Sequence, residues 1–273
     1  ADRGARVTAL LASLLEQVVE ILSSERPLSE RAHEARKKLK RVRALLRVAR
    51  DINPEFYATE NARCRDIGRM IAPLRESGAV FEAIDALEAD YSDQLAADPF
   101  AVIRAALSGA GEGPLPPETA RMQLDAAIAN AHLALAALWQ LEWPDDRQDE
   151  AAALAAAARR LVRSARAALK AVRRDPAGET QHELRKALKY LWLGGKFMRE
   201  VWPSDLRPAG KLLRGLIDLL GAIHDIDDLL ARLAETEPDV PAAQEVLVAL
   251  LQARRSRLAA EFEVMLDKLD LPK

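Results

Sequence analysis

Apolar side chains recur at three- and four-residue spacing along nearly the whole chain, and no segment keeps a sustained period of two. The first pattern places apolar residues on one face of an α-helix, whereas a half-buried strand requires alternation. Aromatic residues make up only 4% of the 273 residues, and Ala, Leu, Arg and Glu dominate, which is a mixture of high helix propensity. The sequence therefore predicts an all-α fold.

Clusters of proline, glycine and aspartate break the helical pattern into separate segments. Helices are expected over residues 5–22, 28–50, 54–76, 78–96, 99–108, 117–142, 146–174, 178–200, 205–235 and 239–269. Pro73 falls inside the third segment and predicts a kink or an early end near residue 72, because proline lacks the backbone N–H.

The segment Trp143–Asp146 is the expected junction between two halves of the chain. The second half contains four long helical segments, which form an antiparallel bundle if the loops stay short. The first half opens in the same order and has extra helical pieces near 99–142. We therefore expect two four-helix bundles related by a pseudo-twofold. The first, with additional helices, spans residues 1–143 and the second spans 144–273, and together they form one domain.

One short motif occurs twice in the chain. His33-Glu34-Ala35-Arg36-Lys37-Lys38-Leu39-Lys40 returns as His182-Glu183-Leu184-Arg185-Lys186-Ala187-Leu188-Lys189, with six of the eight positions identical. Both copies begin a long helical segment, and most of the matching residues are polar. Polar residues on a solvated face have little packing reason to recur, so the repeat indicates a function shared by both copies and directed at negative charge.

Each copy separates a core face from a cationic face when its residues are placed around a helix. In the first copy the cationic face carries His33, Arg36, Lys40, Arg43 and Arg47, flanked by Lys37, and the core face carries Ala35, Leu39, Val42, Leu46 and Ala49. In the second copy the cationic face carries His182, Arg185, Lys189 and Lys196, flanked by Lys186, and the core face carries Leu184, Leu188 and Leu191. Trp192 replaces Arg43 in the second stripe, where its ring can pack against a guanidinium or an alkyl stem. We expect the two cationic faces to line one shared groove.

Charge is strongly segregated although the net charge is only −2. Residues 31–50 carry nine Lys or Arg against one acid, residues 159–174 carry seven bases and no acid, and residues 76–125 carry ten acids against two bases. A merely soluble helix mixes signs to gain ion pairs, whereas like charges three or four residues apart repel. The basic runs therefore indicate an anionic partner. Further bases near the motif helices are Arg63, Arg65, Arg69, Arg159, Arg163, Arg166, Lys170, Arg173, Lys211, Arg214, Arg254, Arg255 and Arg257.

A second repeated element follows each motif helix, as Arg65-Asp66-Ile67 in the first half and His224-Asp225-Ile226 in the second. We expect both aspartates to hold a neighbouring basic side chain or to close an internal salt bridge. His132 lies in a segment rich in Ala and Leu and is expected to be a core or boundary residue.

These elements together resemble the CHAD family, the conserved-histidine α-helical domains. The likeness rests on the duplicated His-x-x-Arg-Lys-x-x-Lys helix and on the Arg/His-Asp-Ile helix after it, and it extends over roughly residues 5–269. The resemblance implies two four-helix bundles with pseudo-twofold symmetry and a basic surface or channel between them. It also implies binding of inorganic polyphosphate without catalysis, and association with polyphosphate granules. The chain departs from the family pattern at Trp192, at His224 in the place of Arg65, and in its acidic segment.

The candidate polyphosphate-binding residues are His33, Arg36, Lys37, Lys40, Arg43, Arg47, Arg65, Arg69, Arg163, Arg166, Lys170, His182, Arg185, Lys186, Lys189, Lys196, Lys211, Arg214 and His224. The candidate residues within the two eight-residue repeats match the family motif. The remaining candidates come from the basic stripes and from the helices beside them. No catalytic residue, metal ligand or cofactor is expected. A polyanion favours the charged form of histidine, so binding is expected to strengthen modestly as the pH falls from about 8 to about 6.

Other functions share parts of this pattern. Nucleic acid would meet the same basic surface, but the stripes contain almost no interleaved aromatics for stacking bases. An acidic protein partner, or self-association through residues 76–125, is a further alternative. A metal-dependent hydrolase could use His224 with Asp227 and Asp228, which share a helix face, but no Walker loop or nucleophile with a base accompanies them.

The remaining composition limits the cellular setting. Cys64 is the single cysteine, which excludes an internal disulfide framework and fits a reducing compartment. No run of about 18 uncharged apolar residues occurs, so no membrane span is expected. We therefore expect a cytoplasmic protein.

Overall fold

Every regular element among the described residues is a helix. The computed structural model describes residues 3–74, 84–85, 88–89, 100–101, 115–199, 202, 210–235 and 241–271. The α-helices are α1 (Arg3–Ser23), α2 (Leu28–Leu46), α3 (Pro54–Met70), α6 (Pro117–Ala137), α7 (Arg147–Arg174), α8 (Gly178–Phe197), α9 (Gly210–Glu235) and α10 (Pro241–Asp267), with short 3-10 helices η1 (Ala49–Asp51) and η3 (Leu138–Gln140). The predicted all-α fold is confirmed.

The ends of the helices follow local chemistry. The Asn53 side chain accepts a hydrogen bond from the backbone N–H of Phe56 at 3.0 Å, and Pro54 occupies the first turn of α3. The Asp146 carboxylate accepts the N–H groups of the second and third residues of α7 at 2.7 and 3.1 Å. Helix α3 ends at Met70, before Pro73, as expected. Helix α2 ends at Leu46, earlier than expected, and the chain continues into η1.

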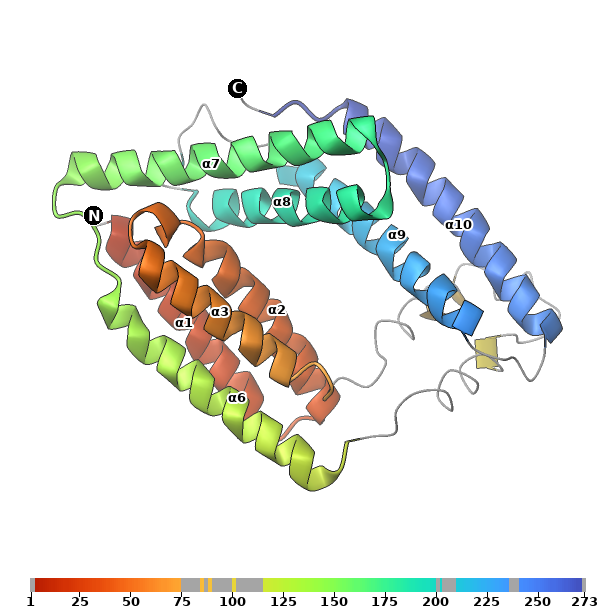
Figure 1. Ribbon diagram of the computed structural model, residues 1–273, viewed down its shortest axis with the longest axis horizontal. Coiled ribbons are helices and arrows are strands. Elements are labelled where there is room, and N and C mark those ends of the chain that lie inside the picture. Colours follow the sequence, from red (N-terminus) through yellow and green to blue (C-terminus); the bar gives the residue numbers. More distant parts are fainter. Residues whose placement is uncertain are drawn as a thin grey trace.

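The first half forms a four-helix bundle. Helix α1 packs on α2, α2 on α3, α3 on α6 and α6 again on α1, which closes a ring (Figure 1). The predicted core face of the first motif helix is buried at all its positions, namely Ala35, Leu39, Val42, Leu46 and Ala49. Burial of each such leucine stabilises the fold by roughly 1.5–3 kcal/mol, so these contacts fix which face of α2 remains open to solvent.

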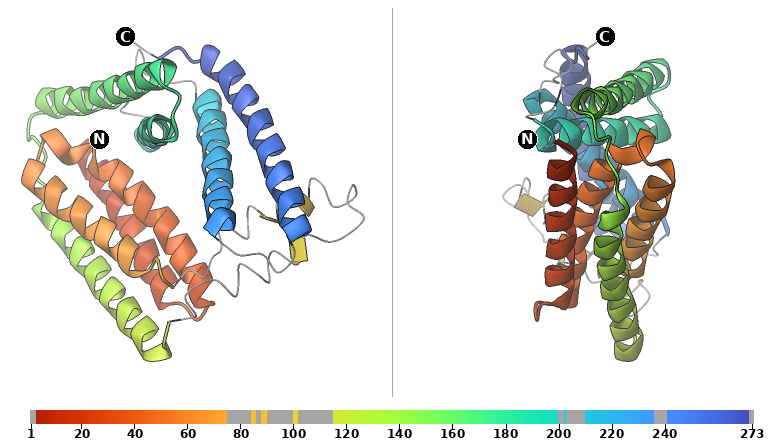
Figure 2. Two further views of the ribbon diagram at one scale, coloured as in Figure 1. Left: turned by 45° about the vertical axis from the view of Figure 1, so that its right-hand side comes forward. Right: turned by 90° about the vertical axis from the view of Figure 1, so that its left-hand side faces the viewer.

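The second half packs in chain order, α7 against α8, α8 against α9 and α9 against α10. Helices α7 and α8 lie across one end of the first bundle, and α9 and α10 descend on the side away from α6 (Figures 1 and 2). This arrangement is compatible with the expected second bundle. Ile84 and Phe100, which precede the expected junction in the chain, share a core with Ile226 of α9 and Leu247 of α10.

Two expected helices, over 78–96 and 99–108, lie outside the described residues apart from 84–85, 88–89 and 100–101. Those six residues are helical. The division of the chain at residue 143 stays a prediction.

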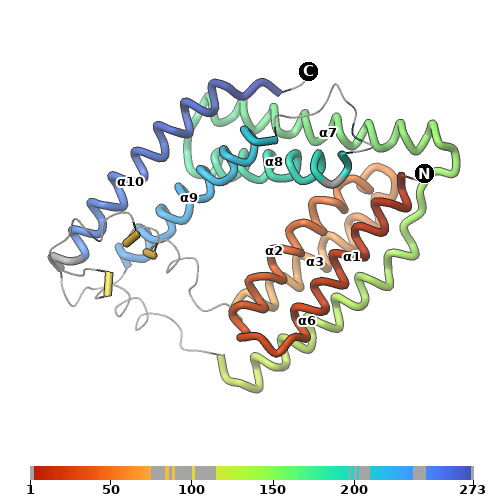
Figure 3. Tube along the Cα trace, turned by 180° about the vertical axis from the view of Figure 1, so that it is seen from behind, coloured from red at the N-terminus to blue at the C-terminus, as the bar shows by residue number. Residues whose placement is uncertain are grey.

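The two halves are fastened at the start of α1. The carboxylate of the buried Glu150, on α7, accepts the backbone N–H of Gly4 at 2.6 Å, at the helix end where negative charge is favoured. The Trp143 indole N–H donates to the Thr8 hydroxyl at 2.9 Å. A Cβ atom on Gly4 would lie 2.3 Å from the Trp143 ring, so only glycine fits this approach. Helix α2 also packs directly against α8, which brings the two copies of the motif together (Figure 3).

Candidate functional site

A cavity of about 370 Å³ lies between the two motif helices. Its lining residues are Lys40 and Arg43 from α2, and His182, Arg185, Lys186, Lys189 and Tyr190 from α8. We call it the α2–α8 cavity. Among the described residues that line it, every charged one is a base, and both motif helices contribute. The shared groove expected from the sequence therefore has a counterpart in the structure, and its chemistry suits an anion.

Positively charged side chains lie close together at the α2–α8 cavity. Burial lowers the pKa of the Lys189 ammonium, and the neighbouring charges of Arg185 and Arg41 lower it further. The Nε of Arg185 is buried and has no hydrogen-bond partner among the described residues. A cluster of like charges with an unused donor costs free energy in the empty protein, and a bound anion would relieve that cost.

A second cavity, of about 410 Å³, lies between α8 and α9. We call it the α8–α9 cavity. It shares His182 and Arg185 with the first and adds His224, but the carboxylates of Glu179, Glu183 and Asp227 also line it, so its charge is mixed. The rings of His182 and His224 lie 5.3 Å apart between centroids. Partial burial lowers the pKa of His182, and the nearby His224 and Lys186 act in the same direction. His182 and Arg185 thus connect two adjoining hollows.

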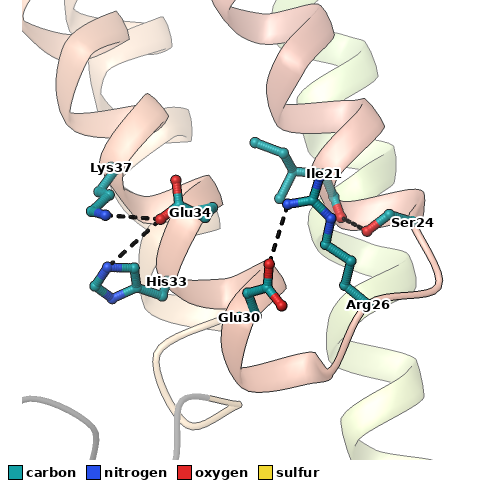
Figure 4. A network of polar contacts seen from close by, with 7 residues as sticks. All are labelled: Ile21, Ser24, Arg26, Glu30, His33, Glu34 and Lys37. Atoms are coloured by element: carbon teal, nitrogen blue, oxygen red, sulfur yellow. Dashed lines mark hydrogen bonds and ion pairs between the residues drawn. The ribbon is translucent and has the colours of Figure 1, made fainter.

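The first copy of the motif begins differently from the second. His33 Nε2 lies 3.8 Å from the Glu34 carboxylate, and Lys37 Nζ donates to the same oxygen at 2.8 Å (Figure 4). The hydrogen bond from Lys37 lowers the pKa of Glu34. Neither His33 nor Lys37 lines the α2–α8 or α8–α9 cavity. In the second copy Lys186 pairs with Glu183 in the same way, at 2.6 Å, yet Lys186 still lines the α2–α8 cavity.

Two predicted site residues connect α2 to α3, and two others pair within α3. Arg36 Nη1 donates to the backbone carbonyl of Gly68 at 2.6 Å, and Arg43 Nε donates to the Asn61 side chain at 3.0 Å. Arg65 and Arg69 both reach Asp66, at 2.9 and 3.5 Å. Asp66 therefore holds neighbouring basic side chains, as expected for this repeated aspartate. Neither Arg65 nor Arg69 lines the α2–α8 cavity.

Aromatic rings lie against other basic side chains that were predicted for the site. The Arg47 guanidinium lies 3.9 Å from the ring centroid of Tyr190, which itself lines the α2–α8 cavity. Lys196 and Arg214 lie 5.4 and 5.9 Å from the Trp192 ring, so the expected packing of Trp192 against a cation is confirmed. Arg214 also lies 3.5 Å from Asp218.

The basic stripe of α7 lies apart from both cavities, because no α7 residue lines either of them. Arg166 and Lys170 instead line a separate hollow of about 480 Å³ with Arg173, Arg174 and residues 269–271. Arg163 is exposed on the same helix, and Lys211 is exposed on α9. The structure thus gathers part of the predicted site and leaves the α7 stripe elsewhere.

Comparison with known proteins agrees with this architecture. A crystal structure of the CHAD domain from the plant Ricinus communis is similar to this chain, with a TM-score of 0.63 and 19% sequence identity, covering 100% of this chain and 94% of that one. At this identity the likeness shows the fold. The search of curated proteins finds no match. The family model of the CHAD domain matches residues 5–234.

The chain belongs to the CHAD family.

His224, Asp227 and Asp228, the residues of the alternative metal site, already pair with each other or with Arg255 in this CHAD domain. Asp227 accepts hydrogen bonds from Arg255, including one from Nη2 at 3.3 Å, and His224 Nε2 lies 3.6 Å from Asp228. Among the described residues no group of three or more His, Cys, Asp or Glu is arranged to hold a metal ion. In the same part of the chain, no helix has the length and apolar character needed to cross a membrane.

The sequence did not single out Tyr190, which lines the α2–α8 cavity, or Arg41, whose charge acts on that cavity, and one histidine was misplaced. Arg41 lies outside the predicted stripe, yet its charge reaches Lys189 because α8 crosses α2 on that side. The sequence did not indicate Tyr190 as a site residue, because an aromatic residue on a motif helix also fits a core position. His132 is exposed on α6, so the expectation of a core or boundary residue was wrong. Ala131 and Ala134 face the core in its place.

Proposed function

We propose that this CHAD domain binds inorganic polyphosphate in the α2–α8 cavity and does not catalyse its hydrolysis. The observation that carries the proposal is the lining of that cavity, where Lys40, Arg43, Arg185, Lys186 and Lys189 converge from both motif helices without an acidic residue among them. Family membership, and the association of this family with polyphosphate, support the same ligand. Under this proposal the protein accompanies polyphosphate granules in the cell.

The mixture of arginine and lysine suits a flexible chain of phosphates. Arginine offers paired donors that match phosphate oxygens, and lysine provides a compact charge that can follow a moving ligand. Among the described residues the buried Nε of Arg185 has no hydrogen-bond partner, so a phosphate oxygen there would satisfy an existing donor. A phosphate oxyanion between Arg185, Lys189 and Arg41 would replace repulsion by attraction.

The ligand's path can extend beyond one cavity. His182 and Arg185 line both the α2–α8 and the α8–α9 cavities, so a linear polyanion leaving the first enters the second beside His224. A single phosphate needs only one of these hollows. The two shared bases favour a chain of several phosphates over orthophosphate, and the carboxylates of Glu179, Glu183 and Asp227 limit how far that chain enters the α8–α9 cavity.

The proposal is tested by calorimetric titration of long-chain polyphosphate into the wild type and the Arg185→Ala/Lys189→Ala variant. Each charge-assisted contact contributes about 1.5–3 kcal/mol, so the double variant is expected to lose at least about tenfold in affinity. The control Arg147→Ala/Lys268→Ala removes the same charge from exposed positions that line neither cavity, and its affinity should stay close to that of the wild type. Equal losses in both variants would refute a localised site.

Two further arms separate the rival functions. DNA or RNA is added at equal phosphate concentration, and ready displacement of polyphosphate would favour nucleic acid as the ligand. Phosphate release is measured after incubation with Mg²⁺ or Mn²⁺, and steady release by the wild type that is absent from a denatured sample would favour an enzyme.

A further inference from the structure

Helix α6 presents an apolar stripe to solvent. Met122, Ala126, Ala129, Leu133 and Ala136 are spaced four, three, four and three residues apart, and all are exposed. Met122 is 68% exposed and Leu133 is 54% exposed. The opposite face of α6 packs on α1 and α3, and the helix lies at the edge of the molecule (Figures 1 and 3). A surface helix normally turns polar residues outward, so this second apolar face has no role in the bundle.

The stripe is complementary to the same stripe on a second copy when the two helices run antiparallel. Met122 and Ala136 lie equally far from Ala129 on either side, and Ala126 and Leu133 lie at nearly equal distances from it. When two copies of α6 are paired antiparallel about Ala129, each large side chain therefore meets an alanine. Small residues at the centre also allow the two helix backbones to approach closely. We propose that this stripe is a homodimer interface in which α6 pairs antiparallel with α6 of a second copy.

The charges beside the stripe fit the same pairing. Asp125 and His132 lie on one flank of the stripe, four residues before and three residues after Ala129. A twofold axis through Ala129 brings Asp125 beside His132 of the partner subunit, where an imidazole N–H can donate to the carboxylate. Arg121 lies 3.9 Å from Asp125 on its own helix, and both side chains are exposed. A parallel pairing would instead place Asp125 and His132 of the two copies on opposite sides of the interface, so this contact would not form.

The size of the surface indicates a weak dimer. Helix α6 has 21 residues, so it is about 30 Å long. One helix pair of that length covers less than the roughly 1,200–2,000 Å² of a stable interface. The dimer is therefore expected to dissociate on dilution, in the micromolar range of about 1–100 μM.

Sedimentation equilibrium over a concentration series tests the interface. The wild type should pass from monomer to dimer as its concentration rises, and Leu133→Glu should remain a monomer throughout. Val264→Glu is the matched control, because Val264 is 57% exposed on α10, far along the chain from the stripe, and it should dimerise like the wild type. Circular dichroism should be the same for all three proteins. A wild type that stays monomeric at the highest concentration, or a Leu133→Glu variant that still dimerises, would overturn the proposal.

A charge exchange tests the antiparallel register. Asp125→Arg should weaken the dimer at least about threefold, and the double variant Asp125→Arg/His132→Glu should restore it, because the opposite charges again meet across the axis. Failure of the double variant to restore association would overturn the register. Polyphosphate affinity should be unchanged in all these variants, since α6 lines neither the α2–α8 nor the α8–α9 cavity.

Discussion

Arg185 links the two cavities of this CHAD domain. Its guanidinium lies against the backbone of α9 at Gly221, where a Cβ atom would come within 2.7 Å of Nη2. Glycine at that position leaves room for the arginine, and the arginine in turn lines both hollows. The absence of a side chain at Gly221 therefore allows Arg185 to lie where the two cavities adjoin.

Gly221→Ala is expected to weaken polyphosphate binding severalfold without destabilising the fold. The added methyl displaces the flexible end of Arg185 rather than backbone, and alanine favours the helix by up to about 1 kcal/mol relative to glycine. Titration and thermal unfolding measure the two effects separately. Gly210→Ala is the control, because a Cβ there meets nothing within 4 Å. An unchanged affinity in Gly221→Ala would show that the position of Arg185 does not matter.

Polyphosphate affinity should rise as the pH falls, through protonation of His182. In the free protein, partial burial, His224 and Lys186 lower the pKa of His182 from 6.5, so the ring is largely neutral at neutral pH. A bound polyanion favours the charged ring and raises that pKa, so binding takes up a proton. Affinity therefore increases as the pH drops through the bound-state pKa and levels off below the free-state pKa. Titrations from about pH 8 to about pH 5 measure the profile. His182→Gln should flatten it, and an identical profile in this variant would contradict a charge role for His182.

At the scale of elements, the two motif helices contribute unequally. Helix α8 supplies His182, Arg185, Lys186 and Lys189 to the α2–α8 cavity, whereas α2 supplies Lys40 and Arg43 from the later turns of its motif stripe. The start of the first copy is engaged in contacts within the first bundle, with Glu34 and with the Gly68 carbonyl. The crossing of α2 over α8 therefore determines which turn of each helix reaches the shared space.

The α7 stripe should act on the ligand only at long range. Arg166 and Lys170 line a different hollow, so Arg166→Ala/Lys170→Ala should reduce affinity less than Arg185→Ala/Lys189→Ala at low salt. Because screened charges act over about 10 Å or less at 0.1 M salt, the remaining effect should disappear as salt is raised. Titrations of both variants at several salt concentrations provide the measurement. A larger, salt-resistant loss in the α7 variant would place direct ligand contacts on α7.

Much of the fold could be predicted from the sequence because helical periodicity is a local property. The core faces of both motif helices and the early end of α3 before Pro73 were predictable from single segments. The crossing of α2 and α8 was not, because it depends on how whole bundles meet. Arg41 was missed for that reason. Helix α7 packs beside α8 as expected, but its basic residues Arg166 and Lys170 line a different hollow. His132 was misjudged because its helix carries apolar residues on both faces.

At the scale of the whole molecule, the site depends on the two halves being held together. Glu150 and Trp143 fasten α7 and the connection before it to α1, and α2 packs directly on α8. The α2–α8 cavity exists only in that arrangement, since its two walls come from opposite halves of the chain. Under the proposed function the two copies of the repeat would therefore act together, each providing one wall of the same cavity.

Cys64 provides a readout of the intact fold for every variant. The thiol is buried, and burial raises its pKa to about 12, so it should resist thiol-reactive reagents in the folded protein. Labelling should proceed only on unfolding by denaturant. A variant that labels rapidly in buffer has lost the first bundle, and its binding data should be set aside. Rapid labelling of the wild type would contradict the buried position of Cys64.

The central claim is that both motif helices contact one polyphosphate chain in the α2–α8 cavity, and a double-mutant cycle across its two walls tests it most directly. Affinity is measured for the wild type, Lys40→Ala/Arg43→Ala, Arg185→Ala/Lys189→Ala and the quadruple variant. Each wall alone should lose at least about tenfold, and the quadruple variant should lose less than the two losses combined, with a coupling of at least about 0.5 kcal/mol. Wild-type affinity in either wall variant, or two strictly additive losses, would contradict a single site shared by the two copies.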